Sequence, residues 1–188
     1  MALPFTAAWR AARERDRRAT LVAEGLGREP DPADVTWLAE AAGGDEDHAL
    51  WELRYARAAI GLLLAQRDAL DDRTAAELAG AIGAMLERDP RIADDRRDLA
   101  AAQFNERLLA YREAFQLRNG PIASADALGR CLLAFSSDGA RTAGAPLAYA
   151  IELLEKYAAE ASALLAKAYG EVQLPEDVPP SVLRGRDG

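Results

Sequence analysis

Apolar residues recur along the chain at spacings of three and four, the period of an amphipathic α-helix. Short stretches of glycine, proline and aspartate interrupt this pattern, and such residues commonly mark the ends of helices. The interruptions divide the chain into seven predicted helices. They span about residues 7–24, 32–42, 47–69, 72–88, 90–118, 125–135 and 146–169.

Capping residues support these boundaries, since Ser, Thr and Asp side chains accept hydrogen bonds from the first turn of a helix. The expected caps are Thr6, Asp31, Asp89 and Ser124. Pro32 and Pro90 follow two of them, and proline suits the first helical position. At the other ends, Gly25 and Gly27 are expected to stop the first helix and Gly170 the last.

The apolar faces of the predicted helices indicate how they pack. The helix at 47–69 is apolar on several sides, which is typical of a central helix with many neighbours. The helix at 72–88 carries one stripe that includes Leu78 and Ile82. Because helix-favouring Ala, Leu, Arg and Glu dominate and sheet-favouring residues are scarce, the sequence predicts an all-α fold. We expect the helices at 47–69, 72–88, 90–118 and 146–169 to form an antiparallel helical bundle around a shared core.

The same breaks predict three regions. Residues 1–44 would form an N-terminal two-helix arm, bounded by Gly43-Gly44. Residues 45–170 would form the helical bundle core. Residues 171–188 would be an extended, Pro-rich C-terminal tail, because a proline disfavours helix at the residue before it.

Composition narrows the function. The 188 residues carry a net charge of −8 and have a pI of about 4.8, which argues against nucleic acid as a partner. Residues 1–30 are the exception, with a net charge of +2. The start of the chain lacks the pattern of a signal peptide, and no apolar run is long enough for a membrane span. We therefore expect a cytoplasmic protein, and the strong preference for Arg over Lys suggests a bacterial source.

Three acidic residues are the main candidates for a metal site. Asp94, Asp95 and Asp98 lie in the sequence Asp-Asp-Arg-Arg-Asp, which resembles the DDxxD motif with which all-α isoprenoid synthases hold Mg²⁺ and a diphosphate. Those families carry a second acidic motif on a facing helix, and the nearest candidate here, Asp68 with Asp71 and Asp72, lies at a helix junction. We favour the simpler interpretation that these acids stabilise the positive end of a helix dipole.

Other catalytic arrangements are incomplete. His48 is the only histidine, with Glu52 one turn further on, whereas di-metal bundles need two Glu-x-x-His elements. We expect His48 to lie at a solvated helix start. Cys131 is the only cysteine and lies in an apolar run, so we expect an inert, buried thiol and no disulfide. No cofactor or catalytic residue is predicted.

These observations lead to two hypotheses. The first is a non-enzymatic helical protein that acts by protein–protein binding, as an adaptor, regulator or assembly subunit. Its protein partner, or a second copy in self-association, would be bound through Trp9, Arg13 and Arg17 in the basic first helix. The alternative is a small Mg²⁺-dependent enzyme, or a carrier of a diphosphate or apolar ligand, that uses the interior of the bundle.

Overall fold

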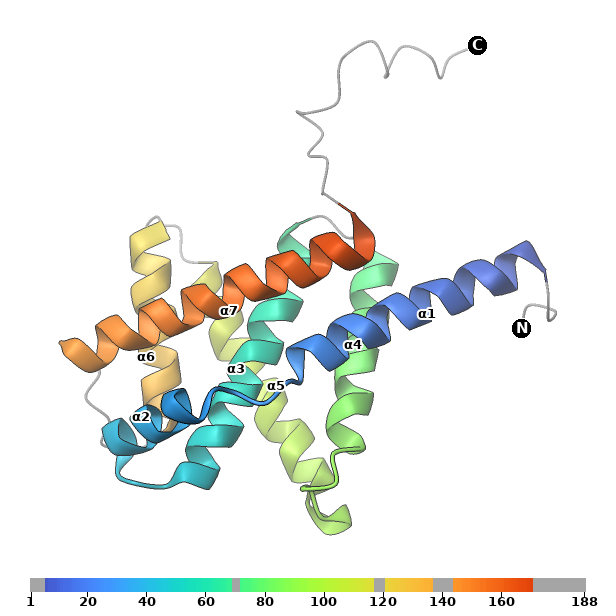
Figure 1. Ribbon diagram of the computed structural model, residues 1–188. Coiled ribbons are helices and arrows are strands. Elements are labelled where there is room, and N and C mark those ends of the chain that lie inside the picture. Colours follow the sequence, from blue (N-terminus) through green and yellow to red (C-terminus); the bar gives the residue numbers. More distant parts are fainter. Residues whose placement is uncertain (1–5, 69–71, 117–120, 137–143, 171–188) are drawn as a thin grey trace, which may run out of the picture.

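The computed structural model describes residues 6–68, 72–116, 121–136 and 144–170. Within these ranges the chain forms seven α-helices and one short 3-10 helix, with no strand, which confirms the predicted all-α fold (Figure 1). The elements are α1 (Ala7–Leu26), α2 (Pro32–Ala42), α3 (Glu46–Arg67), α4 (Asp72–Glu87), η1 (Asp94–Arg96), α5 (Arg97–Phe115), α6 (Pro121–Ser136) and α7 (Ala145–Tyr169).

The predicted caps of the first two helices are confirmed. The Thr6 hydroxyl accepts a hydrogen bond from the backbone N–H of Trp9 at 3.2 Å. The Asp31 carboxylate accepts one from the N–H of Ala33 at 2.9 Å, and proline occupies the first position of α2. Gly43 ends α2 with φ of 112°, a left-handed conformation that glycine adopts without steric cost. Side-chain chemistry alone was therefore sufficient to locate these ends.

The fifth helix begins later than predicted. Asp89 and Pro90 do not start it, because the chain makes a turn in which the N–H of Ile92 donates to the carbonyl of Asp89 at 3.1 Å. The Asp89 carboxylate accepts the N–H of Arg91 at 2.9 Å within this turn. The 3-10 helix η1 follows, so that α5 starts only at Arg97 and ends at Phe115.

The sixth helix begins earlier than predicted. Pro121 is its first residue, and Ser124 lies inside α6 instead of capping it. The Ser124 hydroxyl donates to the carbonyl of Ala114 at 2.9 Å, near the end of α5. This hydroxyl therefore ties the first turn of α6 to the end of α5.

α3 is the central helix, as its broad apolar face predicted. It packs against all six other helices, and every residue from 52 to 65 is buried. α3, α4, α5 and α7, the helices expected to form the bundle, do not enclose the core by themselves, because α1, α2 and α6 also contribute buried residues to it. α4 packs mainly on α1, and α6 lies between α5 and α7 (Figure 1).

The first helix has two different halves. One side of its second half is buried, and Val22 and Leu26 belong to the same apolar core as Leu38 of α2. Close approach of α1 to α3 depends on Gly61, because a Cβ there would lie 2.5 Å from the methyl carbons of Leu26. The first half of α1 extends past the other helices (Figure 1). The division into an arm at 1–44 and a core at 45–170 stays a prediction, but part of that arm contributes to the core.

Two further predictions concern the C-terminal tail and membrane-spanning helices. The extended tail at 171–188 lies outside the described residues. Among the helices that are described, none combines the length and apolarity that crossing a membrane requires.

Candidate functional site

The exposed first half of α1 brings the predicted binding residues together. We call residues 7–18 the basic half-helix, since they include five arginines and two acids. The guanidinium carbon of Arg13 lies 5.3 Å from the centre of the Trp9 ring, a cation–π contact. Arg17 follows Arg13 by four residues and therefore lies on the same side of the helix.

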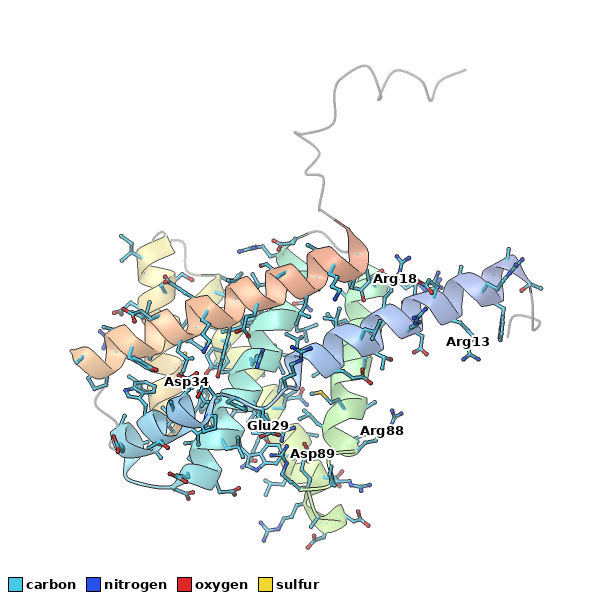
Figure 2. All side chains as sticks on the ribbon, in the orientation of Figure 1. Arg13, Arg18, Glu29, Asp34, Arg88 and Asp89 are labelled. Carbon is cyan, nitrogen blue, oxygen red and sulfur yellow. The ribbon has the colours of Figure 1, made fainter. Side chains whose placement is uncertain are left out.

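The charges of the basic half-helix are only partly neutralised. Arg18 pairs with Glu14 at 3.0 Å, and Arg15 pairs with Glu77 of α4 at 3.2 Å. Arg13 and Arg17 are exposed, and neither forms an ion pair with any residue that the structure describes. Figure 2 shows the Arg13 side chain extending from the part of α1 that lies beyond the other helices.

A second feature is a polar cleft of about 390 Å³ beside the first half of α3. η1 and the beginning of α5 form its opposite wall. Acidic, basic and aromatic side chains all reach it, so it differs from an apolar packing defect. The polar and aromatic residues that line it are Asp45, Asp47, His48, Trp51, Glu52, Tyr55, Arg91, Arg96 and Gln103.

The floor of this cleft is a buried ion pair between α3 and α5. Glu52 is 2% exposed, and its two oxygens accept hydrogen bonds from the Arg107 guanidinium at 2.8 and 3.1 Å. Arg107 also lies 4.5 Å above the ring of Phe135. Burial by itself lowers the pKa of Arg107, but the hydrogen bonds and charge of Glu52 outweigh it and raise that pKa.

His48 is not simply a solvated residue at the helix start. Its side chain is half-buried, and Nε2 lies 2.9 Å from the carbonyl oxygen of Phe135. Because a carbonyl only accepts, this nitrogen carries the proton. Nε2 also lies 4.0 Å from the Glu52 carboxylate. His48 therefore ties the start of α3 to the end of α6.

Two aromatic residues of α3, Trp51 and Tyr55, line the cleft. Trp51 and Tyr55 lie with ring centres 5.7 Å apart. Tyr55 is 3% exposed, and its hydroxyl has no hydrogen-bond partner among the described residues. Burial, followed by the negative charge of Glu52, raises the pKa of Tyr55 and keeps the hydroxyl protonated.

An ion-pair network joins the rim of the cleft to the rest of the fold. The Asp89 carboxylate binds the guanidinium of Arg54, and both side chains are buried. Asp89 also lies 3.4 Å from Nε of Arg91, which in turn binds Glu29 between α1 and α2 (Figure 2). Arg54 further lies 4.6 Å from the centre of the Trp51 ring. The turn before η1 is thereby fixed to α3.

This network predicts a loss of stability in acid. Burial raises the pKa of Asp89, but hydrogen bonds from the Arg91 backbone and from Arg54 outweigh it and lower that pKa. A carboxyl group with a lowered folded-state pKa stabilises the protein above its unfolded pKa, about 3.9, and loses this effect as the pH falls through the folded value. We expect Asp89→Asn to be clearly less stable than the wild type at pH 7.

The difference in unfolding free energy between the two proteins should narrow as the pH falls below about 4, because the unfolded wild type then takes up a proton at Asp89 that the folded protein, with its lowered pKa, binds less readily. Chemical denaturation of both proteins between pH 7 and pH 3 measures it. A difference in unfolding free energy that stays constant over this range would contradict the assignment.

The acidic motif that resembles an Mg²⁺ site lies on the surface. Asp98 is in the first turn of α5, whereas Asp94 and Asp95 are in the 3-10 helix η1 and not, as expected, in the long fifth helix. All three are exposed, and Asp94 pairs with Arg97 at 2.7 Å. The described residues contain no group of three or more His, Cys, Asp or Glu side chains placed to hold a metal ion.

The space between α4 and α5 is mainly apolar. A cavity of about 150 Å³ there is lined by residues that include Leu86, Phe104 and Leu108. Of the second candidate acidic group, Asp68 pairs with the adjacent Arg67 at 2.6 Å, and Asp71 lies outside the described residues. None of the described candidate acids, Asp68, Asp94, Asp95 and Asp98, lines this cavity.

Cys131 is half-buried instead of fully buried. Its thiol lies 3.9 Å from the carbonyl oxygen of Ala110. Burial, reinforced by the charge of Glu113, raises the pKa of the thiol, and so disfavours the reactive thiolate. The expectation of an unreactive cysteine agrees with this environment.

Sequence analysis missed a third polar cluster, which joins α2 to α7. Asp34 is buried and accepts hydrogen bonds from the Tyr149 hydroxyl at 2.9 Å and from Lys156 at 3.2 Å. The Tyr149 ring also contacts Trp37, with ring centres 4.3 Å apart. Asp34 is in the first turn of a helix, where an acid is expected whether or not it has a distant partner.

Together, the described residues define an all-α protein with an exposed basic half-helix and a polar cleft with an ion-paired floor. No family model, curated protein or solved structure matches the chain.

Proposed function

We propose that the protein is a non-enzymatic binding protein, an adaptor, regulator or assembly subunit, that holds an acidic protein surface through its basic half-helix. The observation that carries this proposal is the exposure of Arg13 and Arg17, which lack ion-pair partners among the described residues. Arginine and aromatic side chains are the usual anchors of protein interfaces.

The two sides of α1 explain why these residues are available. Trp9, Arg13 and Arg17 follow a four-residue spacing, which places them on one side of the helix. The residues buried against the other helices, such as Ala19 and Val22, lie on the opposite side. Packing of α1 therefore leaves the basic side accessible to a partner.

Charge favours an acidic partner. Residues 7–18 carry a net charge of +3, whereas the whole chain carries −8. A positive segment on a negative molecule guides an acidic surface toward one end and repels it elsewhere. The alternative of a Mg²⁺-dependent enzyme has weaker support, because Asp94, Asp95 and Asp98 are exposed to solvent.

Affinity capture with the full-length chain tests the proposal. The tagged wild type is compared with Arg13→Glu/Arg17→Glu, and captured proteins are quantified by mass spectrometry. We expect the variant to capture at least about tenfold less of a partner protein than the wild type does. A tenfold loss of affinity corresponds to about 1.4 kcal/mol of binding free energy.

A matched control separates the site from the overall charge. Arg28→Glu/Arg88→Glu makes the same change of charge at two other exposed arginines. This control should capture the partner as well as the wild type does, and circular dichroism should show equal helix content in all three proteins. Equal capture by the wild type and by Arg13→Glu/Arg17→Glu would refute the proposal.

A further inference from the structure

We infer that the acidic surface bound by the basic half-helix is on a second copy of this chain, at the polar cleft and the turn beside it. This inference rests on the proposed function and names its partner. The occupant of the cleft would be the side of α1 that carries Trp9, Arg13 and Arg17.

The turn between α2 and α3 concentrates negative charge. Residues 31–47 contain six acids and no Lys or Arg. Asp34 is buried against Tyr149 and Lys156, and the other five are exposed. We call these five the acidic corner. They are Asp31, Glu40, Asp45, Glu46 and Asp47.

The polar cleft opens beside the acidic corner, and Asp45 and Asp47 belong to both. Its interior offers what a Trp and Arg surface needs, namely aromatic contact and acceptors for N–H groups. Trp51 provides an aromatic ring, and the hydroxyl of Tyr55, a residue that lines the cleft, lacks a hydrogen-bond partner among the described residues. An incoming N–H group would supply that partner.

The basic side chains of the cleft do not cancel its preference for a positively charged surface. Arg91 is already paired with Glu29 and Asp89. Arg96 lies at η1, on the wall opposite α3. The charge offered at the α3 side of the cleft is therefore that of the acidic corner.

The two complementary surfaces cannot meet within one molecule. Figure 1 shows the start of α1 at one end of the structure and the turn between α2 and α3 at the other. The contact must form between copies, with the half-helix of one on the acidic corner of the next. Such a head-to-tail contact leaves one unused surface at each end, so it can repeat.

Sedimentation velocity measures the association directly. The full-length wild type is expected to show a mass that rises above 20.2 kDa with concentration at 50 mM salt. At 500 mM salt the mass should return toward that of the single chain, because ions screen exposed charges.

Two charge reversals test which surfaces meet. Arg13→Glu/Arg17→Glu changes the net charge of the half-helix from +3 to −1, and Glu40→Lys/Glu46→Lys/Asp47→Lys changes that of the acidic corner from −5 to +1. Each variant alone presents like charges on both surfaces and should remain a single chain. An equimolar mixture restores opposite charges, so it should associate again. Asp45 is left unchanged because it caps α3.

The mixture also controls for folding, because association restored by mixing cannot come from an unfolded variant. Arg28→Glu/Arg88→Glu is the control for charge, and it should associate as the wild type does. Two results would overturn the inference, a wild type that stays a single chain at low salt and a mixture of the reversed variants that does not associate. Neither of these results would contradict the proposed function if Arg13→Glu/Arg17→Glu loses a captured protein whose sequence differs from that of this chain.

Discussion

Replacing Glu52 with alanine is expected to lower the free energy of unfolding by about 3–5 kcal/mol. The change removes the partner of Arg107 and leaves a buried guanidinium group without its counter-charge. Glu52 is 2% exposed and Arg107 is 7% exposed, so water cannot replace the lost contacts without opening the interface of α3 and α5. Chemical denaturation followed by circular dichroism measures the effect.

The same arginine provides the control. Arg107 also pairs with Glu106 at 2.6 Å, but the Glu106 side chain is 66% exposed. Exposed ion pairs contribute about 0–1 kcal/mol, so Glu106→Ala should change the stability little. Replacing both Glu52 and Arg107 with apolar residues of similar size should recover much of the loss, because no charge is then left buried. Equal effects of Glu52→Ala and Glu106→Ala would contradict this account.

Leu78→Ala and Ile82→Ala should each cost about 2–5 kcal/mol of stability. Both side chains are fully buried and lie one turn apart on α4, which packs against α1, α3 and α5. Truncation removes apolar surface from the core and leaves a cavity that the surrounding helices fill only in part. Thermal and chemical denaturation measure the loss.

Leu109→Ala is the matched control for these changes, because the Leu109 side chain on α5 is 57% exposed. Its loss of stability should be much smaller, since little of its surface leaves water on folding. Comparable losses at Leu78 and Leu109 would mean that α4 does not contribute to the core in the way described.

Local chemistry made most helices predictable from the sequence. The Asp31-Pro32 start of α2 and its Gly43 end depend only on neighbouring residues, and both were predicted correctly. The predicted start of α5 was wrong, because Asp89 interacts with a residue far away in the sequence instead of capping the helix. Its carboxylate binds Arg54 and holds a turn, and a local pattern does not show that interaction.

In the candidate site, too, the arrangement of residues within one helix was predictable, and the contacts between residues far apart in the sequence were not. Trp9, Arg13 and Arg17 lie four residues apart in one helix, so the sequence alone places them on one side. The buried pair of Glu52 and Arg107 joins residues 55 positions apart. Helical periodicity carries no information on such a pairing. The polar cleft follows from the packing of α3 against η1 and α5, which no local signal specified.

The packing of Gly25 in α1 against Leu164 in α7 has a consequence for synthesis of the chain. These residues are in close contact, although nearly the whole chain separates them in sequence. A ribosome that adds about 5–20 residues per second makes roughly 140 residues in about 7–30 s. During that interval Val22 and Gly25 of the nascent chain have no α7 to cover them. Until α7 has been made, this side of α1 stays open to water or to a chaperone.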